Sequence, residues 1–111
     1  MAAVELRDGG ALAGWAGLSV PHFLPELLPA VEVGWRLGEG FRRRGYATEA
    51  GRAWVEYGFG YGGLDEIISI YEPENTASGA VMRRLGFRHD RDVALPSRGL
   101  TLRVMKRTRD Y

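Results

Sequence analysis

The chain has 111 residues, which is enough for one domain and too few for two. Hydrophobic residues make up 45% of it and charged residues 26%, as in ordinary soluble globular domains. It has no cysteine, which excludes disulfides and a cysteine nucleophile, and with only two histidines we expect no metal site. The net charge of +1 and the lack of a long apolar run lead us to expect no nucleic-acid partner, no membrane span and a cytoplasmic setting.

The first part of the chain predicts a β-hairpin followed by a proline-rich loop. Val4–Arg7 and Leu12–Leu18 have strand character, and Asp8-Gly9-Gly10 between them is a strong turn signal. Prolines at positions 21, 25 and 29 then predict a loop with no more than a short helical turn. The clearest strand of the chain follows at Ala30–Leu37, where apolar and polar residues alternate.

The centre of the chain predicts a strand, a helix and a second strand. A basic, glycine-rich loop leads from Ala30–Leu37 into a helix expected over Tyr46–Tyr61, and Glu66–Tyr71 is the second strand. This order implies parallel pairing of the two strands. Residues spaced three and four apart predict the stripe of the helix that faces the core, namely Tyr46, Ala50, Ala53, Trp54, Tyr57 and Tyr61.

The last third predicts a second helix and a closing strand. The helix is expected over Ser78–Leu85, and a short strand begins at Phe87-Arg88. The polar stretch Asp90–Gly99 is expected to be a mobile loop, and Leu100–Val104 alternates as the closing strand. These elements predict a single domain over residues 1–111 with an α+β (α/β) fold, a mixed and mostly antiparallel sheet, and a central βαβ unit.

The loop before the first helix carries the clearest functional signal. A helix N-terminus exposes unpaired N–H groups and a partial positive charge, which together suit an anion. Gly45 lets the backbone approach such an anion closely, and the arginines at positions 42 to 44 add charge, although they could be only a solvated surface run. The spacing from Gly40 to Gly45 matches a P-loop, but Tyr46-Ala47 replace the Lys-Ser/Thr pair. Hydrolysis of a nucleoside triphosphate is therefore not expected.

Three stretches in the same order and spacing resemble the GCN5-related N-acetyltransferases (GNAT). The loop Arg42-x-x-Gly45-x-Ala47 is similar to the family signature Arg/Gln-x-x-Gly-x-Gly/Ala. Glu32–Leu37 resembles the fourth strand of the family, and Gly45–Ala50 resembles the loop-to-helix junction of the branch that includes the ribosomal-protein N-terminal (Rim-type) acetyltransferases. Asn75–Ser78 with Met82–Phe87 resembles the downstream Asn-x-x-Ser and Leu-Gly-Phe elements. The resemblance as a whole covers roughly Val4 to Lys106.

The resemblance implies an enzyme that transfers an acetyl group from acetyl-CoA to a primary amine, on a protein N-terminus or a small molecule, by direct attack. In the family, two central strands splay apart and the pantetheine lies in the gap like an added strand. Carried over, the implied coenzyme A contacts are Leu37, Gly38 and Glu39 to the pantetheine, Arg42, Arg43, Arg44, Gly45, Tyr46 and Ala47 to the pyrophosphate, and Asn75 and Ser78 to the thioester arm.

Two residues are candidates for proton transfer in this reaction. Glu32 could remove a proton from the acceptor ammonium, and Ser78 could protonate the departing thiolate, with Tyr71 in reserve. Each has a structural alternative. Glu32 could pair with Arg36 on the same strand face, and Ser78 could be the helix N-cap with Asn75 as a turn residue.

The chain departs from the family pattern at its N-terminus, where no counterpart of the family's first strand and two helices is seen. We therefore expect an N-terminally shortened domain and a homodimer or higher oligomer, which would bury the edge at Val4–Arg7 and apolar surface near Trp15, Leu18 and Trp35. The alternative function is a non-catalytic coenzyme A-binding or assembly module. The arginine, glycine and alanine bias favours a bacterial source.

Overall fold

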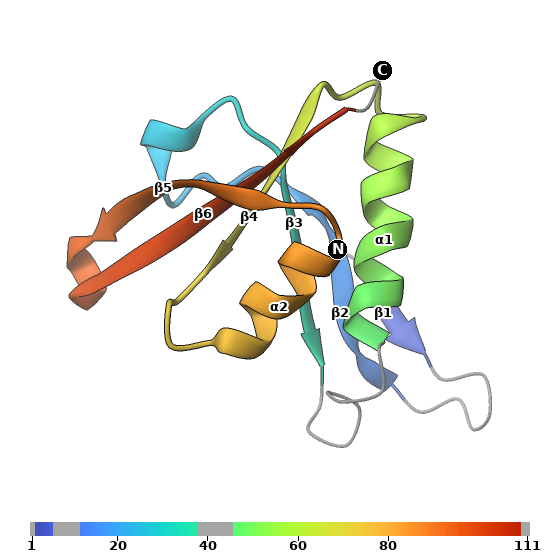
Figure 1. The fold of residues 1–111 in the computed structure, drawn as a ribbon, viewed down its shortest axis with the longest axis horizontal. Helices are drawn as coiled ribbons and strands as arrows, with labels where there is room; N and C mark the ends of the chain where they lie inside the picture. Colours follow the sequence, from blue (N-terminus) through green and yellow to red (C-terminus); the bar gives the residue numbers. More distant parts are fainter. Residues whose placement is uncertain (1, 6–11, 38–45, 110–111) are drawn as a thin grey trace.

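The computed structural model describes residues 2–5, 12–37 and 46–109. Within them one mixed sheet has the strand order β1-β2-β3-β4-β6-β5, and both α-helices lie on the same face of it (Figure 1). No helix in these ranges is long and apolar enough to cross a lipid bilayer. The elements are β1 (Ala2–Glu5), β2 (Leu12–Ser19), the 3₁₀ turn η1 (Pro25–Leu27), β3 (Glu32–Leu37), α1 (Tyr46–Phe59), β4 (Glu66–Tyr71), α2 (Thr76–Arg84), β5 (Arg88–Leu95), the 3₁₀ turn η3 (Pro96–Arg98) and β6 (Leu100–Thr108).

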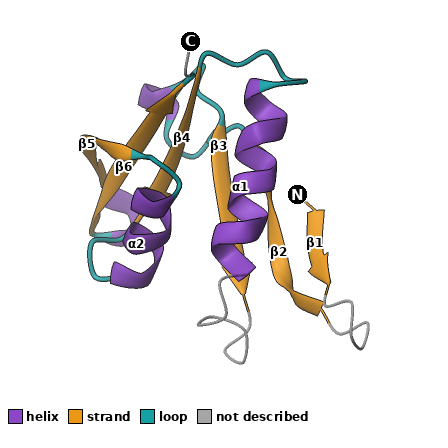
Figure 2. Cartoon of the chain, turned by 45° about the vertical axis from the view of Figure 1, so that its right-hand side comes forward, coloured by secondary structure: helices purple, strands orange, loops and turns teal. Residues whose placement is uncertain are grey.

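The pairing of the strands confirms the predicted sheet. The hairpin β1–β2 and the pairs β2–β3, β4–β6 and β5–β6 are antiparallel, whereas β3 and β4, which flank α1 in sequence, are parallel. The turn predicted at residues 8 to 10 lies outside the described residues. Figure 2 shows β3 and β4 close together near one end and diverging toward the other, which is the splay that the family resemblance implied.

Two hydrophobic clusters cover the two faces of the sheet. On the helix face, Val55 of α1 and Met82 of α2 pack with Val33, Ile67 and Phe87, and Trp35, Trp54 and Phe59 lie against this cluster. On the other face, Leu24 and Leu27 of the proline-rich loop are buried over β4, β5 and β6. The loop that prolines keep out of regular structure therefore serves as the cover of this face.

The face of α1 that packs on the sheet differs from the predicted stripe. Tyr57 is 51% exposed and Tyr61, beyond the helix, is 92% exposed, so the prediction that they face the core is wrong. The buried side instead carries Gly51, Val55 and Gly58. A Cβ at either glycine would come within 2.8 Å of a core side chain, because the helix lies very close to the sheet. A hydropathy pattern misses such a face because glycine has no apolar side chain to count.

The prediction of a mobile loop over Asp90–Gly99 is also wrong. β5 extends to Leu95 and pairs with β6 along most of its length. Only Val93 of β5 is buried, Leu95 is partly buried on the same side, and residues 88–92 are exposed and mostly charged. Charged residues are common on edge strands, where they discourage pairing with other chains, and here they concealed the strand pattern.

Gly79 provides a test of the close packing of α2. A Cβ at this position would lie 2.9 Å from Cε2 of the buried Tyr71 ring, which cannot bend away as a flexible side chain would. We expect Gly79→Ala to destabilise the protein by roughly 1–2 kcal/mol, because overpacking costs about 1–3 kcal/mol and the better helix propensity of alanine returns up to about 1 kcal/mol. Chemical denaturation measures the change.

The exposed Ala77 of the same helix supplies the control. Ala77→Gly measures the helix-propensity difference without any contact to Tyr71, and it should be mildly destabilising. If Gly79→Ala raised the free energy of unfolding by as much as Ala77→Gly lowers it, the close contact with Tyr71 would cost no stability, and the prediction would be wrong.

Candidate cofactor and catalytic site

The gap between β3 and β4 begins one position after the strands meet. Their register contains the single pair Glu32 with Ile68, and the Ile68 N–H donates to the Val31 carbonyl at 2.9 Å. One residue further along β4, the buried Ser69 hydroxyl donates to the Val33 carbonyl at 2.8 Å. Beyond these contacts the two described strands diverge, so that main-chain groups on both edges face the gap.

Glu32 lies at the start of β3 on the face opposite the helices. Its neighbour Val33 is buried under α1, and its partner Ile68 belongs to the other cluster, which fixes the side on which Glu32 projects. Burial raises the pKa of its carboxyl from 4.5 to about 6, and a hydrogen bond from the Ser19 side chain opposes this shift in part. The carboxylate is therefore available as a base close to neutral pH.

Asn75 and Ser78 lie next to each other at the beginning of α2, on the face of the sheet that both helices cover. The helix starts at Thr76, and the Asn75 side chain accepts a hydrogen bond from the Ser78 N–H at 3.2 Å. Asn75 is therefore the N-cap, and the alternative in which Ser78 caps the helix is wrong. Asparagine and serine can both cap a helix. Asn75 holds the cap position here because α2 starts at Thr76, two residues before the predicted start at Ser78. The Ser78 hydroxyl is not used as the cap.

Tyr71 is placed for packing rather than for proton transfer. Its ring is buried against the helix at Gly79, and its hydroxyl is hydrogen-bonded to the Arg103 side chain of β6. Since β6 lies on the opposite side of β4 from β3, this hydroxyl is directed away from the gap. The structure gives no support to its reserve role.

The first turn of α1 contains a polar group that sequence reasoning overlooked. Oγ1 of Thr48 is buried and has no hydrogen-bond partner among the described residues. A buried hydroxyl without a partner is costly, and in the first turn of a helix it is suited to an anion bound there. A threonine directly after the glycine-rich loop was the available signal. Of the predicted contacts, Leu37 ends β3 and Tyr46 and Ala47 begin α1, whereas Gly38, Glu39, Arg42, Arg43, Arg44 and Gly45 lie outside the described residues.

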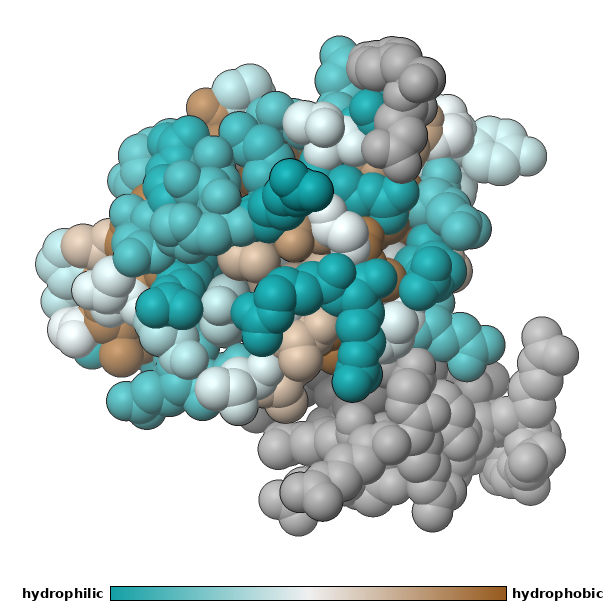
Figure 3. All heavy atoms as spheres, in the orientation of Figure 1, coloured by the Kyte–Doolittle hydropathy of each residue, from teal (hydrophilic) through white to brown (hydrophobic). Residues whose placement is uncertain are grey.

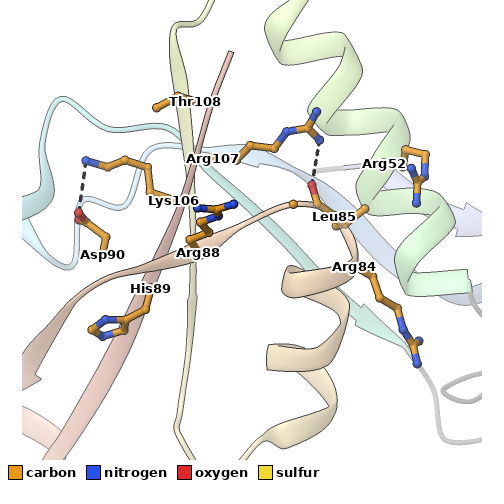
Figure 4. A pocket seen from close by; sticks show the side chains of 10 residues that line it. Arg52, Arg84, Leu85, Arg88, His89, Asp90, Lys106, Arg107 and Thr108 are labelled. Atoms are coloured by element: carbon orange, nitrogen blue, oxygen red, sulfur yellow. Dashed lines mark hydrogen bonds and ion pairs between the residues drawn. The ribbon is translucent and has the colours of Figure 1, made fainter. Parts of the chain in front are cut away.

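A basic hollow of about 630 Å³ lies where the C-terminal end of α2 meets β5 and β6 (Figure 4). The face of the molecule around it is largely hydrophilic (Figure 3). Arg107 is held in it by a 2.9 Å hydrogen bond to the Leu85 carbonyl and by its position over the Phe59 ring, 5.5 Å from the centroid. The lining contains one histidine, His89, and one carboxylate, Asp90. Its positively charged residues are Arg52, Arg84, Arg88, Lys106 and Arg107. This excess of positive charge suits an anionic ligand.

Comparison with known proteins identifies the family. The sequence matches the acetyltransferase (GNAT) domain over residues 1–88. The chain belongs to the GNAT family. Two uncharacterized N-acetyltransferases of Bacillus subtilis (strain 168) are similar: YnaD is 41% identical over 59 residues, which are 53% of this chain and 35% of YnaD, and YoaA is 30% identical over 87 residues, which are 78% and 48%.

Solved acetyltransferase structures have the same fold. A GNAT-family acetyltransferase from Bacillus anthracis superposes with a TM-score of 0.80 at 26% identity, covering 96% of this chain and 64% of that one. An acetyltransferase from Agrobacterium tumefaciens gives 0.78 at 31% identity, with 96% and 59% covered. The chain spans about half the length of the B. subtilis relatives, or less, and about three fifths of these structures.

Glu32 should make stability depend on pH in a recognisable direction. Its pKa in the folded protein lies above its ordinary value, so its contribution to stability is fully present below pH 4.5 and is lost as pH rises through about 6. We expect Glu32→Gln to raise the melting temperature by a few degrees at pH 7.5 and to give no gain at pH 4. Glu56→Gln, at an exposed position of α1, is the control and should change little at either pH. An equal effect of Glu32→Gln at both pH values would contradict the burial of a charged carboxylate.

Proposed function

We propose that this chain forms the acyl-CoA-binding core of an N-acetyltransferase that moves an acetyl group from acetyl-CoA to a primary amine of a protein N-terminus or a small molecule. The observation that carries the proposal is the parallel β3–β4 contact that stops after one pair, followed in the chain by the motif Arg42-x-x-Gly45-x-Ala47, whose last residues begin α1. These two features match the two ends of one ligand: the gap between the strands suits a long extended thioester arm, and the helix N-terminus suits the pyrophosphate joined to it.

Described residues support the fit of coenzyme A. The unpartnered Thr48 hydroxyl in the first turn of α1 suits the pyrophosphate, and the basic hollow supplies further cations for the phosphates of the nucleotide end. Arg52, which lines that hollow, is six residues after Tyr46, or about 9 Å along the helix axis. The proposed contacts of residues 37 to 39 and 42 to 47, and those of Asn75 and Ser78, complete the cofactor site.

The proposed mechanism uses one group on each side of the sheet. Acetyl-CoA supplies the thioester carbonyl carbon that the amine nitrogen attacks. Glu32 takes the proton from the acceptor ammonium, directly or through a water molecule, and Ser78 donates a proton to the departing thiolate. Support comes from the pKa of Glu32 near 6, from the Ser78 hydroxyl not being used as the helix cap, and from the location of Glu32 where the gap begins, on the face of the sheet opposite α2.

Membership of the Rim-type branch, a bacterial cytoplasmic setting and homodimerisation remain predictions from the sequence. The motif Gly45–Ala50 supports the branch, and β1 is the edge strand of the described sheet. The alternative, a coenzyme A-binding module without turnover, shares the cofactor site. Separate measurement of acetyl-CoA binding and of acetyl transfer distinguishes the two functions, because the module would bind without turning over.

Coenzyme A binding should depend on Gly45. Glutamate at this position places a side chain and a negative charge beside a bound phosphate, so we expect Gly45→Glu to weaken coenzyme A binding at least about tenfold in calorimetry. Arg98→Gln is the matched control, because it also lowers the net charge by one but changes the exposed turn between β5 and β6. Unchanged affinity in Gly45→Glu would contradict the proposed pyrophosphate site.

Turnover should depend on Glu32 and Ser78 more than cofactor binding does. We expect Glu32→Gln to lower kcat by about 10²–10⁴-fold and to leave the KM for acetyl-CoA nearly unchanged, since general base catalysis contributes about this much. In the wild type, kcat should fall as pH drops through about 6, where Glu32 becomes protonated. Ser78→Ala should lower kcat at all pH values, and kcat of this variant should still fall as pH drops through about 6. Full activity of Glu32→Gln at neutral pH would remove Glu32 from the mechanism.

A further inference from the structure

Ser69 connects the two strands at the point where their pairing ends. It lies in the middle of β4, is 1% exposed, and donates from its hydroxyl to the Val33 carbonyl of β3 at 2.8 Å. Side chains seldom contribute to a ladder between neighbouring strands, since backbone groups normally supply every bond. The described part of this contact has only one backbone-paired position, Glu32 with Ile68, directly before Ser69.

The backbone group that Ser69 replaces can be identified from the geometry of a strand. Along a strand, successive residues direct their N–H and C=O groups to alternate sides. The Ile68 N–H points to β3, where it bonds to the Val31 carbonyl, so the Ile70 N–H points to β3 as well. In a continuing parallel ladder, Ile70 N–H would bond to the Val33 carbonyl. That carbonyl is the one that accepts from Ser69.

We propose that Ser69 is a positioning residue of the cofactor site, because its hydroxyl ends the β3–β4 ladder and thereby sets where the gap opens. It satisfies the Val33 carbonyl without bringing the Ile70 backbone up to β3. The Ile70 N–H and the backbone groups of Trp35, which point to the same gap by the same alternation, stay available to a bound thioester. The inference rests on the proposed acyl-CoA function for its purpose, although not for its geometry.

A purely structural role leads to the opposite expectation for the Ile70 amide. If the hydroxyl only held the strands together, its removal would loosen this part of the sheet and the amide would exchange its hydrogen faster. If the hydroxyl ends the ladder, its removal frees the Val33 carbonyl for the Ile70 N–H. The two strands then pair for one more step, and the amide exchanges more slowly.

The test compares Ser69→Ala with Ser69→Thr, which keeps the hydroxyl, and with Val93→Ala. Val93 is a buried residue of β5, separated from β3 by two strands, and its truncation controls for lost stability alone. Hydrogen exchange at the Ile70 amide is followed by NMR, and coenzyme A affinity by calorimetry. We expect Ser69→Ala to slow Ile70 exchange and to weaken coenzyme A binding about tenfold or more, Ser69→Thr to restore both, and Val93→Ala to leave the affinity unchanged.

Each other result has a definite meaning. Unchanged or faster exchange at Ile70 in Ser69→Ala would overturn the proposal and leave Ser69 a structural residue. Slower exchange with unchanged coenzyme A affinity would overturn its link to the cofactor. If wild-type protein fails to bind coenzyme A while Ile70 exchange still slows in Ser69→Ala, the proposed function fails, and the role of Ser69 in ending the ladder stands.

Discussion

The parallel contact between β3 and β4 is formed by one backbone-paired position and one serine hydroxyl, and the candidate site is arranged around the place where it ends. Parallel strands pair in register only if successive N–H groups keep finding carbonyls. Once that series stops, the two edges carry main-chain groups that are not used within the sheet. In most folds such an interruption inside a sheet would be a defect, because unpaired backbone groups are costly when buried. Here the interruption lies beside the polar groups of the site.

The rest of the sheet and the two helices stabilise this interruption. β4 pairs with β6 over six residues and β3 with β2 over six, so each edge of the gap belongs to a firmly paired strand. Above the gap, α1 and α2 pack close to the sheet through Gly51, Gly58 and Gly79, where a Cβ would come within 3 Å of a neighbouring side chain. Close contact of helices with β3 and β4 fixes the angle between the strands. The glycines therefore act on the gap through packing, at a distance from any ligand.

The fold could be predicted from the sequence wherever apolar side chains occupy the buried positions. The hairpin, β3, β4, β6 and the βαβ order all follow from alternation and turn residues. The prediction failed in two places: α1 faces the sheet partly through Gly51 and Gly58, which have no apolar side chain, and β5 is a mostly exposed edge strand rich in charge. The cofactor loop remains a prediction, and it could be made from the sequence because its motif is local. Thr48 and Ser69 were not recognised, because an unpartnered hydroxyl and a bond between strands exist only in three dimensions.

The two sides of the sheet have different chemical environments, and the gap is where they meet. Glu32 projects toward the face under the proline-rich loop, where burial holds its pKa near 6, whereas Ser78 lies at the start of α2 on the helix face. Separated by the sheet, they can act on one molecule only if it reaches both of them through the gap. In the mechanism that we propose, the acyl donor therefore lies between the strands, the amine arrives from the Glu32 face, and the thiolate leaves on the side of Ser78.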